Sequence, residues 1–380
     1  MSASPKRPSA RAPDVLLAAQ DASLDWNALE DLIHRDAGAR GLASYRKGGI
    51  SLDRGQLRAA ALDLAENSRS VAIVTGFCSV LSDRVTAETD GPPGALFLAQ
   101  LLHSLGIEVT IITDRYALPL VESGCAQSGL DRKILVEFPF ERGAADDPAR
   151  TRNDAPKSVK IDHWVDEFLS HGRGRNLSHL VAIERPGPSH TLESVMAQPR
   201  DAAATLERFR EEVPDDERDV CHDMHGSAIS VHTAKTHRLF EVVLERRLPI
   251  TTIGIGDGGN EIGMGRFSWE DLVCAIGGAA AGRIACRIGT DFALIAGVSN
   301  WGAYALALAV AQLRGQVDAS RWLRPDGQRE LIETMVTSAG AVDGRTLLSE
   351  PSVDGLSMDV YLAPLTEMHV LLARAPSADR

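Results

Sequence analysis

Acidic side chains inside a glycine-rich segment give this chain its most unusual chemistry. Residues Gly254–Gly265 read GIGDGGNEIGMG, which places Asp257, Asn260 and Glu261 among six glycines. Glycine allows a backbone to approach a ligand closely, and carboxylate and amide oxygens suit hard cations such as Mg²⁺, Mn²⁺ or Ca²⁺. We therefore predict that Asp257 and Glu261 are catalytic residues that hold a divalent metal, and that Asn260 binds substrate. A tight turn with capping acids is the purely structural alternative.

The same segment is only loosely similar to the GxGxxG motif that binds dinucleotides. That motif opens the first βα unit of a domain and avoids acids, which would repel a pyrophosphate, whereas this segment contains two acids. The chain also lacks a GxxxxGKS/T P-loop and a GxSxG elbow, which argues against a P-loop nucleotidase and a serine hydrolase. We expect no nucleotide cofactor.

A second acidic motif, Glu88–Gly94 (ETDGPPG), supplies a candidate base and a candidate anion site. Its two prolines are suited to the first turn of a helix. Free backbone amides at a helix start attract anions such as a substrate carboxylate. We predict Glu88 as a catalytic residue, and Asp90 and Gly91 as substrate-binding residues. Ordinary helix capping by Asp90 is the alternative.

Two further segments offer polar groups to a substrate. In the segment ERPGP, the guanidinium of Arg185 could clamp a carboxylate through two parallel hydrogen bonds, or it could form a surface ion pair with Glu184. The segment VSNWGAY precedes an apolar helix, where Ser299 or Asn300 would make a good N-cap or bind substrate. We include all four residues in the predicted substrate site.

The roles of His222, His225 and Lys235 stay open from the sequence. The segment CHDMHGS places two histidines three residues apart with an acid between them. A zinc site would need a further ligand, so the sequence favours a plain histidine-rich turn. Lys235 could act as a base or an anion contact, or lie exposed at the surface.

Strand-like and helix-like segments alternate along the chain, which predicts an α/β fold with a doubly wound, mostly parallel sheet flanked by helices. We expect one domain over residues 13–380, preceded by a disordered tail, residues 1–12, rich in Pro and Ser. Residues 186–230 show no clear apolar period and are predicted as an inserted cap region. The expected strands are 70–75, 108–113, 133–138, 179–184, 250–255 and 291–296, and the expected helices 14–36, 57–67, 92–105, 116–123, 161–170, 232–247, 301–313, 327–335 and 363–373.

Three polar loops follow predicted strands directly and carry most of the candidate residues. These loops are 76–91, 184–190 and 256–268. In open parallel sheets, ligands bind outside the carboxyl ends of the strands. We therefore expect the three loops to lie on one edge of the sheet and to share a site.

Composition excludes several other classes of protein. The formal net charge of -12 and the lack of a dense basic cluster argue against nucleic acid as a partner. No apolar run approaches the roughly 18 residues that a membrane span needs. The five cysteines form no CxxC pair, which favours a reducing compartment. We expect a cytoplasmic protein, or one of the mitochondrial matrix if the source is eukaryotic, and self-association into a homo-oligomer is compatible with the sequence.

Five motifs in order give the chain a specific resemblance. They are Thr75–Phe77, Glu88–Ala95, Glu184–Pro188, Gly254–Gly265 and Val298–Gly302. Together they resemble the D-glutamate cyclase family in its carboxyl-terminal domain, over roughly residues 25–375. The long glycine motif carries most of this specificity.

The resemblance implies a lyase that converts D-glutamate to 5-oxo-D-proline with loss of water. The amine of an amino-acid substrate would attack the carboxyl carbon of its own side chain, with Glu88 or Glu261 as the base and a metal on Asp257 and Glu261 stabilising the oxyanion. Arg185 and the helix start near Pro92 would hold the α-carboxylate. Two alternatives remain: a metal-dependent enzyme acting on a phosphorylated or nucleotide substrate, and a non-catalytic amino-acid sensor.

Overall fold

A six-stranded parallel sheet forms the centre of the protein. The computed structural model describes residues 15–141, 160–198, 202–316 and 324–373, so the expected tail 1–12 lies outside the described residues. Every neighbouring pair of strands in the sheet is parallel. The strands, in spatial order, are β5 (Leu135–Glu137), β4 (Glu108–Thr113), β1 (Ser70–Thr75), β6 (His179–Ile183), β7 (Thr251–Gly256) and β8 (Phe292–Ile295).

The order of the strands produces a switch point at the middle of the sheet. The chain runs outward from β1 through β4 to β5, then returns to the other side of β1 and continues outward through β6, β7 and β8. The connections after β1 and β6 therefore diverge, and the crevice between their carboxyl ends is where open α/β sheets bind ligands. The predicted doubly wound parallel fold is confirmed.

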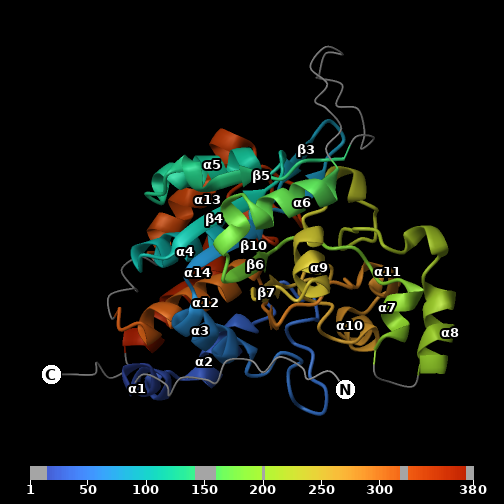
Figure 1. Cartoon of the computed structure of the whole chain (residues 1–380), viewed down its shortest axis with the longest axis horizontal. Coiled ribbons are helices and arrows are strands. Elements are labelled where there is room, and N and C mark those ends of the chain that lie inside the picture. The colour runs from blue at the N-terminus through green and yellow to red at the C-terminus, as the bar shows by residue number, and fades with distance from the viewer. Residues whose placement is uncertain (1–14, 142–159, 199–201, 317–323, 374–380) are drawn as a thin grey trace.

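Helices cover both faces of this sheet (Figure 1). Side chains of β1 alternate between the faces: Val71 and Ile73 join one hydrophobic cluster, and Ala72 and Val74 join the other. The first cluster includes side chains of α2 (Trp26–Ile33), α3 (Gln56–Asn67), α4 (Pro92–Ser104), α5 (Leu118–Gln127), α12 (Ser299–Leu313), α13 (Pro325–Ala339) and α14 (Met358–Ala373), with α1 (Val15–Ser23) beside them. The second includes α6 (Ile161–Ser170), α9 (His237–Glu245), α10 (Trp269–Ile276) and α11 (Ala281–Ile284).

The predicted cap region, residues 186–230, adds short helices to the second face. It contains α7 (Leu192–Met196), α8 (Ala202–Glu212) and a 3₁₀ turn at Asp215–Glu217. The ring of Phe209 meets that of Trp269 edge to face at 5.2 Å, and the Trp269 amide donates to Gln198. Figure 1 shows α7 and α8 beside α10 and α11 on the right of the molecule.

Several elements differ from the sequence prediction for local reasons. The expected helix 14–36 is two helices: α1 ends at Ser23, and the Asp25 side chain caps the start of α2 by accepting from the Ala28 amide. The loop 76–91 contains a hairpin of β2 (Cys78–Val80) and β3 (Val85–Ala87), and β9 (Ser352–Val353) pairs with β10 (Leu356–Ser357). Strands this short show no usable alternation. Among the described residues, no helix combines the length and apolarity needed to cross a bilayer.

Candidate active site

Three buried carboxylates converge at the switch point of the sheet. Asp90 follows β1 and its hairpin, Glu184 directly follows β6, and Asp257 directly follows β7. One carboxylate oxygen of each lies within 4.8 Å of one from each of the others. The prediction that the loops after these strands share one edge is confirmed, and we call these three residues the carboxylate cluster.

Asp90 and Asn300 cap each other's helices. The Asp90 carboxylate accepts from the amides of Ser299 and Asn300, both at 2.9 Å, at the start of α12. In return, the Asn300 side-chain oxygen accepts from the amides of Gly91 and Gly94, at 3.1 and 2.8 Å, at the start of α4. Both helix starts are therefore satisfied by protein groups, and their positive ends face the cluster.

Glu184 is held against the start of α4 by a very close contact. Its backbone has a positive φ of 45°, and its Oε2 accepts from the Ser299 hydroxyl at 2.5 Å. A Cβ atom at Gly91 would lie 2.6 Å from the Glu184 Cβ, and Gly91 itself has a φ of 93°. Glycine at position 91 is thus required both for the backbone turn and for this approach. Gly91 shapes the site, and its own amide points at Asp90 and Asn300.

Glu261 shapes the glycine-rich segment, and its charge also raises the pKa of Glu184 beyond the effect of burial. Its carboxylate accepts from the amides of Asp257, Gly258 and Gly259, at 3.1, 2.6 and 2.8 Å. Asn260 ties the same segment to its neighbour, because its side-chain amide donates to the His222 carbonyl at 2.8 Å. The predicted pairing of Asp257 with Glu261 is therefore replaced by a grouping of Asp257 with Asp90 and Glu184.

Arg40 and Asp354 complete the site, although neither follows a predicted strand. The Arg40 guanidinium forms ion pairs with Asp257 through Nη1 and with Asp354 through Nη2. Burial alone would lower the pKa of Arg40, but these two carboxylates raise it well above its ordinary value. The sequence signals beside these two residues are the glycines of Gly38–Gly41 and Gly355. Such glycines indicate turns, but they do not predict that the two turns lie at the same site.

The electrostatics of the cluster favour either bound protons or a bound cation. Burial raises the pKa values of Asp90, Glu184 and Asp257 well above the usual range of carboxyl groups, and neighbouring carboxylates add to this effect. Arg40 acts in the opposite direction on all three. Asp257 also keeps one buried oxygen, Oδ2, without a hydrogen-bond partner. A divalent cation fits this donor set, because it would satisfy that oxygen and replace protons held by the acids.

Glu88 lies at the margin of the cluster with a separate environment. Its Oε1 accepts from the Ser79 hydroxyl at 2.7 Å, and it borders Gly344, where a Cβ would lie 2.0 Å from Oε2. Burial raises the pKa of Glu88 to about 7, and the charge of Asp354 contributes further. A carboxylate of that pKa is suited to exchange protons near neutral pH.

Arg185 belongs to the framework of the site. Its fully buried guanidinium donates to the Thr236 hydroxyl at 3.0 Å, and to the carbonyls of Gly76 and Ala234 at 2.7 and 2.8 Å. It also forms an ion pair with Asp114 at 2.7 Å. These contacts tie the loop after β1 to the segment before α9, and they occupy the groups that we expected to hold a substrate carboxylate.

The three residues of open role separate in space. The His222 ring lies 2.6 Å from Glu217 through Nε2 and is buried, whereas His225 is exposed. Lys235 pairs with Glu141 at the surface, at 2.7 Å. Among the described residues, the grouping of potential metal ligands is the carboxylate cluster, and these histidines are not part of it.

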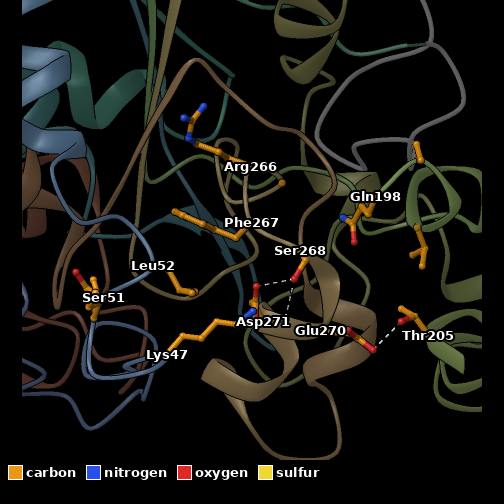
Figure 2. A pocket seen from close by; sticks show the side chains of 14 residues that line it. Lys47, Ser51, Leu52, Gln198, Thr205, Arg266, Phe267, Ser268, Glu270 and Asp271 are labelled. Atoms are coloured by element: carbon orange, nitrogen blue, oxygen red, sulfur yellow. Dashed lines mark hydrogen bonds and ion pairs between the residues drawn. The ribbon is translucent and has the colours of Figure 1, made fainter. Parts of the chain in front are cut away.

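A surface pocket of about 570 Å³ lies apart from the carboxylate cluster (Figure 2). It shares Gly265 with the glycine-rich segment but none of the clustered acids. Its charged groups already have partners: Lys47 reaches Asp271 at 2.6 Å, and Glu270 accepts from Thr205 at 2.7 Å. We therefore place the candidate active site at the cluster.

Comparison with known proteins assigns the family. The family model for D-glutamate cyclase-like C-terminal domains matches residues 29–201 and 201–369. The chain belongs to this family. It is 32% identical over 315 residues to a human protein named D-glutamate cyclase, mitochondrial; the match covers 81% of this chain and 42% of the human protein. The chain thus spans less than half the length of that relative.

The D-glutamate cyclase-like match includes the whole candidate site. Arg40, Glu88, Asp354 and the three residues of the carboxylate cluster all fall within the matched ranges. The resemblance inferred from five short motifs is confirmed.

Proposed function

We propose that this chain is a lyase that closes D-glutamate into 5-oxo-D-proline with loss of one water. The observation that carries the proposal is the convergence of Asp90, Glu184 and Asp257 at the switch point of a D-glutamate cyclase-like chain. The reaction forms a bond between the amine nitrogen and the side-chain carboxyl carbon, and it breaks one carbon–oxygen bond of that carboxyl group.

The reaction depends on the positioning of the two reacting groups more than on a reactive cofactor. Both reacting groups belong to one molecule, and holding it in a folded conformation can contribute about 7–11 kcal/mol toward the barrier. Glu88, whose pKa is raised to about 7, is suited to take the proton that the ammonium must lose before attack.

A divalent cation is part of the proposal, with a ligand set revised by the geometry. Asp90, Glu184 and Asp257 would hold it, with the unpartnered Oδ2 of Asp257 as one donor. Such a cation would supply positive charge to the carboxyl oxygen that becomes negative during attack. Glu261 would keep the segment around Asp257 in shape, since it accepts three amides of that segment.

The alternative of a phosphorylated substrate is less compatible with the same contacts. Anion cradles in glycine-rich loops depend on backbone amides that point at the phosphate. Here the amides of Asp257, Gly258 and Gly259 donate to Glu261. The amides at the starts of α4 and α12 are likewise occupied by Asn300 and Asp90.

The direct test is incubation of the purified chain with D-glutamate or L-glutamate in the presence of Mn²⁺ or Mg²⁺, followed by chiral chromatography. We expect 5-oxo-D-proline to accumulate from D-glutamate in proportion to enzyme. Binding of D-glutamate without product would instead indicate a sensor. A rise in melting temperature with phosphate compounds, and none with D-glutamate, would indicate the phosphorylated-substrate alternative.

A further inference from the structure

Arg40 reaches from the surface into the carboxylate cluster. Its side chain is 15% exposed, whereas those of its partners Asp257 and Asp354 are 0% and 2% exposed. Among these three side chains, that of Arg40 is therefore the one that solvent reaches most. A ligand that enters the cluster from this side meets Arg40 first.

The backbone that carries Arg40 is fixed independently of its side chain. Asp36 accepts from the amides of Arg40 and Gly41, at 2.7 and 2.9 Å. Just before this turn, the Ile33 carbonyl accepts from the Gly297 amide at 2.7 Å. The guanidinium can thus exchange one of its partners while the main chain stays in place.

The two partners of Arg40 differ in how firmly they are built. Asp257 belongs to the glycine-rich segment that Glu261 holds through three amides. Asp354 lies between β9 and β10, two strands of two residues each, in a turn with a positive φ of 56°. Both carboxylates keep a buried Oδ2 without a hydrogen-bond partner, so the elements that carry them are what distinguishes the two: Asp257 follows a central strand of the sheet, and Asp354 lies in a short hairpin.

We propose that Arg40 binds the α-carboxylate of the substrate, and that Asp354 occupies its guanidinium until that carboxylate arrives. The proposal rests on the proposed function and adds the residue that recognises this end of the substrate. Asp257 keeps Nη1 in place, and the exchange occurs at Nη2. A planar guanidinium suits this task, because it can hold a carboxylate through parallel hydrogen bonds, which the single ammonium of lysine cannot.

This role predicts how substrates are distinguished. The carboxyl group that reacts is the one on the side chain, so Arg40 affects binding and orientation and does not touch the reacting atoms. The cyclic product also retains the α-carboxylate. 5-Oxo-D-proline should therefore bind through Arg40. The affinity for 2-pyrrolidinone, the same ring without the carboxylate, should not depend on Arg40.

The test compares Arg40→Lys and Asp354→Asn with the wild type and with Arg35→Lys. The control replaces a nearby exposed arginine that pairs with Glu367 at the surface. Each variant is first checked for an unchanged melting temperature within a few degrees. The Michaelis constant and turnover number for D-glutamate are then measured, together with calorimetric titrations of 5-oxo-D-proline and 2-pyrrolidinone.

We expect Arg40→Lys to raise the Michaelis constant, and the dissociation constant for 5-oxo-D-proline, by at least about tenfold, with a smaller change in turnover number. Binding of 2-pyrrolidinone should not change, Arg35→Lys should match the wild type, and Asp354→Asn should lower the Michaelis constant. A folded Arg40→Lys variant with wild-type constants overturns the proposal, as does a tenfold increase in Asp354→Asn. Absence of turnover in the wild type instead refutes the proposed function.

Discussion

The acids of the site all carry a carboxyl group, but they differ in how many of its oxygens other protein groups already occupy. Asp90 is engaged by the amides at the start of α12, and Glu261 is engaged by those of its own segment. Asp257 keeps an unpartnered oxygen, and Glu88 has a single hydroxyl partner described. Proton exchange and charge stabilisation are therefore expected to depend most on Asp257 and Glu88, whereas Asp90 and Glu261 also hold the backbone of the site in shape.

Replacing Glu88 by Gln should remove a base that works near neutral pH. Since burial raises the pKa of Glu88 to about 7, the wild-type rate should rise with pH through that value as the carboxylate forms. The variant should lose this limb of the pH–rate profile and turn over about 10² to 10⁴ times more slowly. Initial rates from pH 5 to 9 provide the measurement. An unchanged limb near pH 7 in the variant would exclude Glu88 as the base.

The same substitution should change stability in a direction set by the raised pKa. An acid whose pKa rises on folding, here from 4.5 to about 7, favours the folded state fully below pH 4.5 and loses that contribution as the pH rises through 7. Relative to Glu88→Gln, the wild type should therefore lose on the order of 2 kcal/mol of unfolding free energy across this range, allowing for its partial exposure. Urea unfolding at pH 5 and pH 8 measures the difference in unfolding free energy between the wild type and the variant. The same difference at the two pH values would contradict this prediction.

At the scale of elements, the site is built where two helices begin. The starts of α4 and α12 meet at the carboxyl edge of the sheet, and each is capped by a residue from the other segment. This exchange explains why a residue near position 90 and one near position 300 must lie together. It also couples the geometry of the site to the packing of α12, which is buried along its whole length.

Asn300→Ala should lower the unfolding free energy by about 1–2 kcal/mol, because the Gly94 amide loses its acceptor and the Gly91 amide keeps only Asp90. The matched control is Asn176→Ala, which removes an exposed asparagine and should change stability by less than about 0.5 kcal/mol. Equilibrium urea denaturation compares the two. If both variants lose the same small amount of unfolding free energy, the Asn300 cap contributes little to stability.

At the scale of the molecule, the strand order could be anticipated but its consequences for single side chains could not. Apolar runs such as SVAIVT and EVTIIT mark buried parallel strands, and the loops after them were correctly expected on one edge. The sequence does not show which way a carboxylate turns. Glu261 turns into its own segment because three amides face it, and Arg185 turns into the framework toward Asp114.

Residues outside the strand pattern were the other limit of sequence reasoning. Arg40 lies in a turn before α3, and Asp354 lies between two strands of two residues each. Both enter the site through the tertiary fold, since their contacts with each other span 314 positions of the chain. No rule of sequence spacing connects residues at such a separation. Their contact is therefore visible only in the folded structure.

Cation binding should be visible in the stability of the whole molecule. Mn²⁺ should raise the melting temperature of the wild type, because a ligand that binds only the folded state contributes about 2.7 kcal/mol at a hundred times its dissociation constant. Glu184→Gln should lose most of this shift, whereas Glu193→Gln, at an exposed glutamate of α7, should retain it. Differential scanning fluorimetry with and without Mn²⁺ decides. Equal shifts in all three proteins would place the cation elsewhere.

The most direct test of the account is the rate at which D-glutamate becomes 5-oxo-D-proline in the wild type and in a folded Asp257→Asn variant. Asparagine preserves the shape of the side chain but removes the charge and the proton exchange of a buried acid in the carboxylate cluster. We predict steady product formation by the wild type, and a rate at least about 10² lower in the variant. Equal rates in the two proteins would contradict the claim that the carboxylate cluster carries the reaction.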